Sequence, residues 1–309
     1  MTLPKIFIDG EHGTTGLQIR DRLKDRKDLV VVSLAHADRH NKNKRKSLLL
    51  ESHFAILCLP DDAAIEAVEM IDDAGAGTRI NDTSTAHLEA KGWVYGFAEH
   101  ERGLAETIKN ALRVANPGCY STGAIAVIAP LVQAGILPAD YPITINAVSG
   151  YTGGGKQMIA QMENGEAEGA ISESHFAYAL ALAHKHVPDI IDRYGLTTRP
   201  NFTPADARFP QGMLVNVPLH LDLTNASSKA EIHAALVAHY EGQDIVTVAS
   251  LKEADGLGRL APEVMAGKDT MMLYVTGNDE HVNLVAQLDN LGKGASGAAV
   301  QNLNLMLAD

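Results

Sequence analysis

A cysteine follows a Pro-Gly turn in the run Asn116-Pro117-Gly118-Cys119-Tyr120-Ser121-Thr122-Gly123. A strand-like segment precedes the turn, and an apolar segment typical of a helix follows it. A thiol at a helix N-terminus meets free backbone N–H groups and the positive end of the helix dipole, which favour the reactive thiolate. The spacing therefore indicates a nucleophile, with a small buried side chain as the alternative. The other cysteine, Cys58, lies within an apolar run and is interpreted as core.

Two histidines offer a proton partner for this thiol. His184 and His186 flank Lys185 just before Val187 and Pro188. Proline favours an extended residue before it, and if the extension reaches both histidines their imidazoles point to one side. A thiolate paired with an imidazole is an activated nucleophile. Exposed or capping histidines remain an alternative, as does a zinc site, although no Cys-x-x-Cys or third spaced ligand accompanies them.

A glycine-rich turn indicates dinucleotide binding. The segment Gly10-Glu11-His12-Gly13-Thr14-Thr15-Gly16 follows a strand and opens a helix. Glycines let the backbone approach a pyrophosphate, and the helix N-terminus supplies N–H donors to it. We therefore expect Gly10, Gly13, Thr14, Thr15 and Gly16 to bind the cofactor, with an ordinary tight turn as the alternative.

The residues after the second strand bear on the choice between NAD and NADP. An acidic residue there favours the ribose hydroxyl of NAD, and an arginine favours the 2′-phosphate of NADP. The sequence offers both Asp38 and Arg39. The basic run beyond them, Lys42, Lys44, Arg45 and Lys46, is either a solvated helix face or a positive rim for that phosphate. Together with Arg39 it favours NADP.

Alternating strands and helices in the first third of the chain predict a parallel sheet. We expect strands at 5–9, 29–35, 54–59 and 79–82, the second of them covered on both faces, and helices at 17–23 and 63–71. After Cys119, strands at 143–148, 214–223 and 271–276 lack regular helix partners, which predicts an α+β domain with a more antiparallel sheet. Pro130 should kink or end a helix at 121–134, and the second half of 290–309 is expected to be helical.

Composition narrows the class of protein. The 309 residues suggest two domains, with a tight crossover near Asn116. Hydrophobic residues make up 46% and charged residues 21%, as in ordinary globular proteins, and no apolar run predicts a membrane span. Two cysteines and no signal peptide favour a reducing cytoplasm. A net charge of −12 argues against a nucleic-acid partner but not against an anionic small molecule.

The combined motifs resemble the short form of the N-acetyl-γ-glutamyl-phosphate reductase family of arginine biosynthesis. The resemblance covers essentially the whole chain, and its Asn-Pro-Gly-Cys-Tyr and His-x-His-x-Pro-x-Ile runs are specific. The residues that carry it are Gly10–Gly16, Val94–Gly96, Ala115–Thr122, Ser149–Gly155, His184–Ile190 and Asp289–Gly297.

The resemblance implies a fold like those of glyceraldehyde-3-phosphate and aspartate-semialdehyde dehydrogenases. A Rossmann-type NADP-binding domain would comprise 1–117 and 286–309, and an α+β catalytic and oligomerisation domain 118–285. The implied enzyme is a homo-oligomer, dimer or tetramer, that uses NADPH to reduce an acyl phosphate through a cysteine thioester. A related reductase of another acyl phosphate, such as aspartyl phosphate, remains an alternative, as do a non-enzymatic dinucleotide sensor and a zinc-binding structural protein.

The resemblance also implies roles for single residues. His186 is the expected acid/base, with His184 in that role or orienting the substrate. Longer members carry an Arg-Gly pair where this chain reads Ala207-Arg208-Phe209-Pro210-Gln211-Gly212. The remaining implied residues are Pro60, Gly150, Gly153 and Asn290 for the cofactor, and Asn116, Tyr178 and Arg208 for the substrate, with no metal ligands.

Overall fold

The structure is a computed structural model that describes residues 3–308. The chain forms two compact units, residues 1–117 with 295–309 and residues 118–294. The division expected from the sequence placed 286–294 in the first unit, and the structure corrects this. Strand β13 (His281–Leu288) pairs along its whole length with strands of the second unit, so it cannot belong to the first.

The first unit is built on a six-stranded sheet in the order β2-β1-β3-β4-β6-β5, in which all pairs are parallel. Its strands are β1 (Lys5–Asp9), β2 (Val30–Val32), β3 (Phe54–Leu57), β4 (Arg79–Asp82), β5 (Val94–Tyr95) and β6 (Arg113–Ala115). Its helices are α1 (Thr14–Leu23), α2 (Lys42–Glu51), α3 (Asp61–Asp72), α4 (Leu104–Asn110) and α10 (Gly297–Leu307). The parallel sheet predicted from the alternating pattern is confirmed.

The second strand differs from its prediction. The β-branched run at 29–35 forms a strand of only three residues, and it lies at the edge of the sheet. Its first residue, Val30, is 42% exposed, so the strand is not covered on both faces as expected. An apolar, β-branched run predicts a strand and its burial, but it does not distinguish a central strand from an edge strand.

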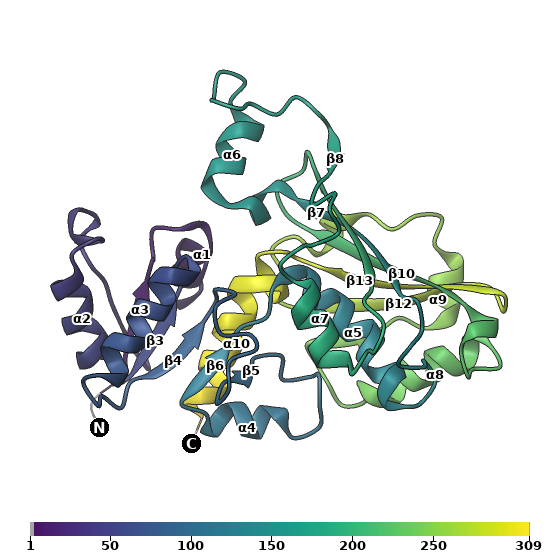
Figure 1. Cartoon of the computed structure of the whole chain (residues 1–309), viewed down its shortest axis with the longest axis horizontal. Coiled ribbons are helices and arrows are strands. Elements are labelled where there is room, and N and C mark those ends of the chain that lie inside the picture. The colour runs from purple at the N-terminus through teal and green to yellow at the C-terminus, as the bar shows by residue number, and fades with distance from the viewer. Residues whose placement is uncertain (1–2, 309) are drawn as a thin grey trace. The chain divides into compact units, whose positions relative to one another are not determined.

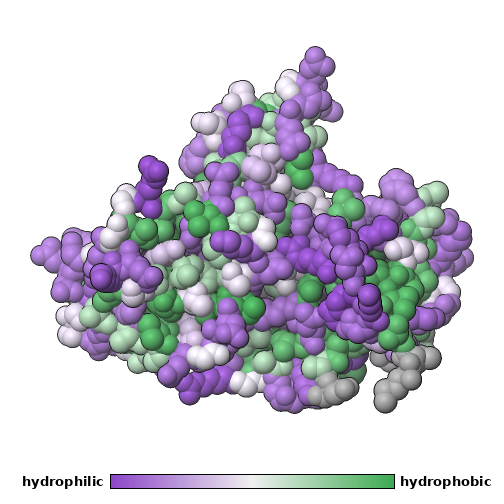
Figure 2. All heavy atoms as spheres, turned by 180° about the vertical axis from the view of Figure 1, so that it is seen from behind, coloured by the Kyte–Doolittle hydropathy of each residue, from purple (hydrophilic) through white to green (hydrophobic). Residues whose placement is uncertain are grey.

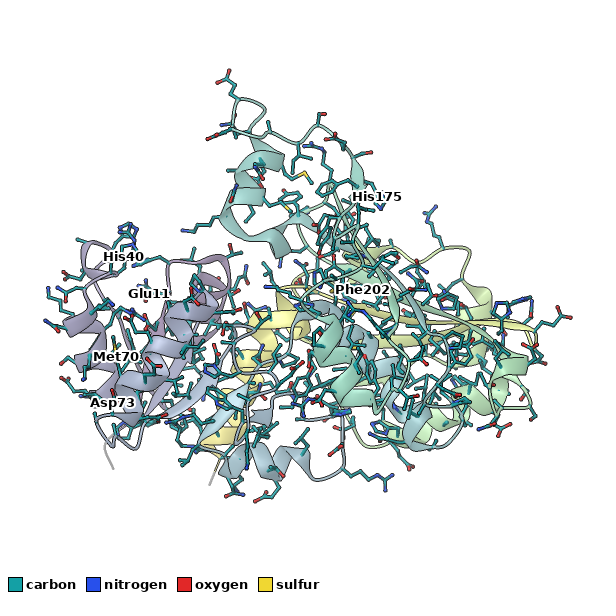
Figure 3. The ribbon with its side chains drawn as sticks, in the orientation of Figure 1. Glu11, His40, Met70, Asp73, His175 and Phe202 are labelled. Atoms are coloured by element: carbon teal, nitrogen blue, oxygen red, sulfur yellow. The ribbon has the colours of Figure 1, made fainter. Side chains whose placement is uncertain are left out.

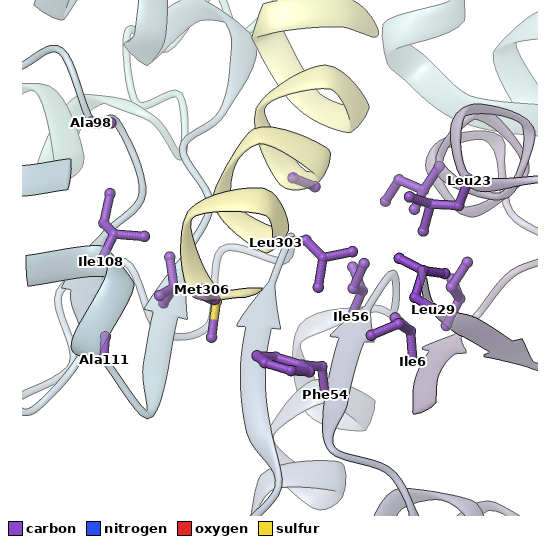
Figure 4. Packing of buried hydrophobic residues seen from close by; sticks show 14 residues of the cluster. Ile6, Leu23, Leu29, Phe54, Ile56, Ala98, Ile108, Ala111, Leu303 and Met306 are labelled. Carbon is purple, nitrogen blue, oxygen red and sulfur yellow. The ribbon is translucent and has the colours of Figure 1, made fainter. Parts of the chain in front are cut away.

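The C-terminal helix completes the core of the first unit. Leu303 and Met306 of α10 pack into a buried cluster with Ile6, Phe54 and Ile56 from the sheet (Figure 4). Helix α10 therefore belongs to the first unit, although it lies at the C-terminal end of the sequence. The expected helix in the second half of the tail is confirmed.

The second unit contains a seven-stranded sheet in the order β11-β12-β13-β10-β7-β9-β8, with antiparallel pairs predominating. Its strands are β7 (Thr144–Gly150), β8 (His175–Ala177), β9 (Asn201–Ala207), β10 (Met213–His220), β11 (Val246–Val248), β12 (Met271–Gly277) and β13. Its helices are α5 (Cys119–Gln133), α6 (Gly155–Glu163), α7 (Val187–Tyr194), α8 (Lys229–His239) and α9 (Leu251–Gly256). In Figure 1, α6 and β8 stand away from the helices α5, α7 and α8.

Helix α5 is the central helix of the second unit. Every residue from Tyr120 to Leu131 is buried, and a Cβ on Gly123 would lie 2.6 Å from Val215 of β10. Pro130 does not end the helix, which continues to Gln133. Packing on all sides compensates for the hydrogen bond that proline removes, because tertiary contacts outweigh local propensity.

Hydrophilic side chains cover much of the surface, and several charged residues are buried, among them Arg45 and Asp9. Figure 2 shows hydrophilic side chains over most of the face it presents, with apolar patches between them. Among residues 3–308, no helix is both long and apolar enough to cross a bilayer. Arg45, however, is 6% exposed, and its Nη2 donates to Oδ2 of Asp9 at 2.8 Å.

The ion pair between Arg45 and Asp9 corrects both interpretations for Arg45 alone, because Lys42, Lys44 and Lys46 of the basic run are exposed. Arg45 reaches into the sheet and binds Asp9 of β1 and Glu66 of α3. Burial raises the pKa of Asp9, and the hydrogen bonds and charge of Arg45 act in the opposite direction. Lys42 pairs with Glu66. Arg45 is therefore a structural cation, neither a solvated residue nor part of a cofactor rim.

Replacing Arg45 by methionine should destabilise the first unit by about 3–5 kcal/mol, because it leaves the Asp9 carboxylate buried without its partner. The loss should appear as a lower denaturation midpoint for that unit in urea, followed by circular dichroism. The matched control is Lys46→Met, which changes the next residue of the same helix at an exposed position and should shift the midpoint little. Equal effects of the two variants would contradict the assigned role.

Candidate active site

Cys119 is the first residue of α5, as predicted. Pro117 and Gly118 stop the preceding segment, and Gly118 precedes the helix with extended backbone angles, φ −77° and ψ 158°. The backbone N–H and hydroxyl of Thr122 both donate to the Gly118 carbonyl at 2.9 Å. The backbone N–H groups of the first turn have no carbonyl partner within the helix, and those of Cys119 and Tyr120 hydrogen-bond to the sulfur.

The thiol is nevertheless protonated in the free protein. Burial raises the pKa of Cys119 to about 12, with a further rise from the charge of Asp206. Hydrogen bonds from the backbone N–H groups of Tyr120 and Cys119 lower the pKa, but by less than burial raises it. The helix N-terminus favours the thiolate as expected, but desolvation outweighs this effect.

His186 lies directly beside the turn that carries the thiol. A Cβ on Gly118 would lie 2.3 Å from Nε2 of His186, so only glycine permits this approach. The ring of His184 is 4.7 Å from that of His186, centroid to centroid. The structure therefore brings together the cysteine segment and both histidines, which lie more than sixty positions apart in sequence.

The local backbone around the histidines differs from the prediction. His186 has helical angles, and Val187 is the first residue of α7 despite the proline that follows it. Proline is tolerated in the first helical turn because its missing N–H has no partner there. The two rings approach through a turn in which the backbone N–H of His186 donates to Nδ1 of His184 at 3.1 Å, rather than through an extended strand.

Both histidines are neutral at physiological pH. Burial lowers the pKa of His186 to about 3, with further lowering by His184 and Lys185. Burial also lowers the pKa of His184 to about 4. Nδ1 of His186 is buried, and no residue in the described part of the chain hydrogen-bonds to it. A neutral imidazole beside a neutral thiol is a base that can take the thiol proton when the sulfur attacks.

Aromatic side chains form one wall of this site. The ring of Tyr120 packs edge-on against Phe202 at 5.3 Å and against His184 at 5.7 Å. Tyr178, which the resemblance places at the substrate, packs against His184 at 5.7 Å and hydrogen-bonds to Tyr120. Figure 3 shows Phe202 within the second unit. Tyr178 therefore lies in the same cluster as the predicted catalytic residues.

Strand β9, which follows Tyr178 and His184 in the chain, holds a further charged group that sequence reasoning missed. Asp206 near the end of β9 is 4% exposed, and burial raises its pKa to about 6. Its charge raises the pKa of Cys119 and of Tyr178. The signal in the sequence was an acid at an inward-facing strand position, two residues after Pro204 and four after Phe202.

The loop after β13 supports the thiol from the other side. A Cβ on Gly294 would lie 2.7 Å from Cβ of Cys119. The carboxylate of Asp289 accepts hydrogen bonds from the backbone N–H groups of Gly267 and Leu291 and holds this loop in place. Sequence reasoning also missed Asp289 as a positioning residue.

Three residues expected at the cofactor lie together in the second unit. Asn290 is buried, and its Nδ2 donates to the Gly150 carbonyl at 3.4 Å and to Oγ1 of Thr152 at 3.0 Å. Its Oδ1 accepts from the backbone N–H of Gly212 at 2.9 Å. A Cβ on Gly153 would lie 3.4 Å from Asn290. Asn290 thus fixes the glycine turn after β7, and cofactor binding by this group stays a prediction.

Two of the expected substrate residues have structural partners. Both terminal nitrogens of Arg208 donate to backbone carbonyls, Nη1 to Met162 at 2.6 Å and Nη2 to Ile171. Asn116 donates to the carbonyl of Ala295 at 3.2 Å and accepts from Asn302 at 3.0 Å. Arg208 therefore fastens the segment after α6, and Asn116 fastens the segment that leads into α10. Their binding of substrate remains a prediction.

The glycine turn of the first unit brings backbone segments so close together that side chains are excluded at two positions. Gly10 has a positive φ of 88°, and a Cβ there would lie 2.2 Å from the carbonyl oxygen of Cys58. A Cβ on Gly16 would lie 2.5 Å from the carbonyl oxygen of Gly10. Helix α1 begins at Thr14, earlier than expected, so Thr14, Thr15 and Gly16 form its first turn. Oγ1 of Thr14 is buried and finds no hydrogen-bond partner among residues 3–308, which suits an incoming phosphate.

The neighbouring cofactor residues are placed by the ends of the strands. Pro60 precedes α3 just beyond β3, and Leu59 lies against Gly10. Nζ of Lys44 lies 2.7 Å from the carboxylate of Asp38 and neutralises it. Arg39 binds the carbonyl of His36 at 2.9 Å.

Neither cysteine belongs to a metal centre in the described part of the chain. Residues 3–308 contain no group of three or more His, Cys, Asp or Glu side chains arranged to hold a metal ion. Burial raises the pKa of Cys58 to about 12, consistent with its interpretation as an inert residue next to the core.

Alkylation of Cys119 should report its protonation state. With Cys58→Ser as background, the rate with iodoacetamide should rise about tenfold per pH unit from pH 8 to 11, because the thiolate reacts and the thiol pKa is raised. Mass spectrometry of the modified peptide measures the rate, and Cys119→Ser gives the blank. A plateau below pH 8 would instead show a thiolate paired with an imidazolium in the free protein.

Comparison with known proteins places the whole chain. Residues 119–290 match the family model described as semialdehyde dehydrogenase, dimerisation domain. Proteins named N-acetyl-gamma-glutamyl-phosphate reductase from Brucella ovis and Brucella canis are each 58% identical over 307 residues, covering 98% of this chain and 99% of theirs.

Solved structures share the fold at low sequence identity. Aspartate semialdehyde dehydrogenase II from Vibrio cholerae, complexed with ASA, has a TM-score of 0.76 at 15% identity and covers 100% of this chain and 99% of its own. The Candida albicans enzyme with NADP has a TM-score of 0.68 at 12% identity, covering 99% and 98%. These structural likenesses show the fold expected from the sequence. The identity to the Brucella proteins, which extends over nearly the full length of the chain, also shows the family. The chain belongs to the N-acetyl-γ-glutamyl-phosphate reductase family.

Proposed function

We propose that this protein reduces N-acetyl-γ-glutamyl phosphate to N-acetylglutamate semialdehyde, with release of phosphate and NADPH as the reductant, in arginine biosynthesis. The observation that carries the proposal is the contact between the cysteine turn and a neutral imidazole. A Cβ on Gly118 would lie 2.3 Å from Nε2 of His186, and Cys119 is the next residue. This arrangement suits a thiol that becomes nucleophilic only as it transfers its proton.

The first stage forms a thioester. The sulfur of Cys119 bonds to the acyl carbon of the substrate while the imidazole of His186 takes the thiol proton. The bond from the acyl carbon to the phosphate oxygen then breaks, and phosphate leaves with its electron pair. Backbone N–H groups of the first turn of α5 stabilise the negative oxygen that forms in between.

The second stage releases the aldehyde. The bound dinucleotide supplies the hydride that reduces the thioester. The imidazolium of His186 protonates the resulting thiohemiacetal oxygen, and the same imidazole then removes that proton as the carbon–sulfur bond breaks. The imidazolium of His186 returns its proton to the sulfur of Cys119, which leaves the thiol as it began. The one proton consumed in each turnover comes from solvent and ends on the released phosphate.

Binding of the dinucleotide is assigned to the turn between β1 and α1. Gly10 and Gly16 leave room for the pyrophosphate, and the unpartnered hydroxyl of Thr14 offers it a hydrogen bond. The preference for NADP rests on Arg39, because Lys44 neutralises the competing carboxylate of Asp38. Gly150, Gly153 and Asn290 are proposed to contribute from the second unit.

We further infer that the protein acts as a homo-oligomer in the cytoplasm. The matched family model describes residues 119–290 as a dimerisation domain, which supports self-association. The two cysteines are both free thiols, as a reducing compartment favours.

Replacing Cys119 by serine should lower turnover by at least about 10³-fold, because the nucleophile is lost. The reaction is followed in reverse as NADPH formation from N-acetylglutamate semialdehyde, phosphate and NADP⁺. Binding of NADPH, measured by fluorescence titration, should stay near wild type. Retained turnover in the variant would exclude the covalent mechanism.

The same assay discriminates the alternatives. Replacing the substrate by aspartate semialdehyde tests the related reductase, and replacing NADP⁺ by NAD⁺ tests the cofactor preference. Faster turnover of aspartate semialdehyde by the wild-type protein would overturn the proposed substrate.

His186→Asn should lower kcat by about 10²–10⁴-fold, because it removes the acid/base. His184→Asn should cost less, since that ring orients its neighbour through the hydrogen bond to the His186 backbone. His175→Asn, at an exposed position on β8 (Figure 3), is the control and should leave turnover unchanged. A loss under tenfold at His186 with a large loss at His184 would reverse the two assignments.

A further inference from the structure

Asp206 occupies an unusual position for a carboxylate. It lies near the carboxyl end of β9, and its backbone pairs with Phe176 of β8 and Ser149 of β7. Side chains alternate along a strand, so Asp206 shares a face with Phe202, whose ring packs against Tyr120 and His184. Asp206 thus points to the side of the sheet that holds the catalytic cluster.

This carboxylate lacks the hydrogen bonds that burial normally requires. As a residue Asp206 is only 4% exposed, and its side chain accepts no hydrogen bond from any residue in the range 3–308. Its carboxylate oxygens nevertheless keep some contact with solvent, because neither oxygen is a fully buried polar atom without a partner. Nearby donors are engaged elsewhere, since the Tyr120 hydroxyl donates to the Ala205 carbonyl at 3.1 Å and Tyr178 bonds to Tyr120. A carboxylate that keeps a small opening to solvent can accept a hydrogen bond from water in the free protein, and from a ligand donor that displaces that water.

The charge of Asp206 reaches the reacting centre. It raises the pKa of the Cys119 thiol and of the Tyr178 hydroxyl. No hydrogen bond joins Asp206 to the thiol, and its negative charge opposes the thiolate, so it does not act as the base for Cys119. Its position instead fits a group that contacts the bound substrate.

The substrate of the proposed function has a single hydrogen-bond donor suited to this group. N-acetyl-γ-glutamyl phosphate carries carboxylate, phosphate and carbonyl oxygens, all acceptors, and one amide N–H. We propose that Asp206 accepts a hydrogen bond from the acylamino N–H of the substrate and thereby orients the acyl phosphate on Cys119. This inference rests on the proposed function and adds a specificity-determining residue to it.

The assignment explains why the site tolerates an unpartnered carboxylate. A hydrogen bond to a buried charged acceptor is among the stronger ones, so the amide N–H gains more from Asp206 than from water. The same charge repels the phosphate of the substrate, which lies at the opposite end of the molecule from the acylamino group. Asp206 thus binds the acylamino end of the substrate and disfavours the reversed orientation, in which the phosphate would lie beside it.

The test pairs two variants with two substrates. Asp206→Leu removes the acceptor and Asp206→Asn keeps its size without charge, while exposed Asp244→Asn is the matched control. The substrates are N-acetylglutamate semialdehyde and 5-oxopentanoate, which lacks the acetamido group, each measured in the NADPH-forming direction or by its Ki as a competitor.

For the acetamido substrate, Asp206→Leu should lower kcat/KM by about 10- to 100-fold, mainly through KM, and Asp206→Asn should lower it less. For 5-oxopentanoate the change should be under about threefold, because no N–H is lost. Equal losses with both substrates, or no loss with either, would overturn the role of Asp206. No turnover of the acetamido substrate by the wild-type protein would instead overturn the proposed function.

Thermal melting separates a folding defect from a lost contact. Because folding raises the pKa of Asp206, to about 6, its favourable contribution is complete at low pH and is lost as the pH rises through about 6. Asp206→Asn should therefore melt above the wild type at pH 8 and close to it at pH 5. A variant that melts lower at both pH values would show that Asp206 supports the fold and not the substrate.

Discussion

The close approach of two backbone segments at the start of α5 is the constraint on which the catalytic cluster depends. Gly118 admits the imidazole of His186, and Gly294 admits the Cys119 side chain, because a Cβ at either position would collide with these groups. Cys119 keeps partial exposure to solvent, and the protein packed around it raises the pKa of the thiol. Packing and reactivity are therefore set together, and neither glycine can be exchanged without moving a reacting group.

Desolvation governs the charges throughout this site. It raises the pKa of the Cys119 thiol and the Asp206 carboxyl and lowers the pKa of both histidines. The free protein therefore holds a neutral thiol beside a neutral base, and the helix N-terminus acts on the charge that develops during reaction. A site of this kind stabilises the transition state more than the resting state, which is what rate enhancement requires.

Local patterns in the sequence predicted a large part of the molecule. The strand at Arg79–Asp82, the glycine turn before α1 and the cysteine at the start of α5 all depend on neighbours within a few positions. Predictions failed where distant contacts decide the outcome. The valine run became a short edge strand, and Val187 entered a helix although a proline follows it.

The sequence by itself determined where the nucleophile, the histidine pair and the phosphate-binding turn occur, because turn residues and apolar periodicity act locally. Only the tertiary structure decided which side chains meet and what charge they carry. Arg45 proved to be a buried partner of Asp9, and Asp206 a buried carboxylate facing the catalytic cluster. Burial and pairing arise from residues far apart in the chain, and they control protonation through the loss of water around each group.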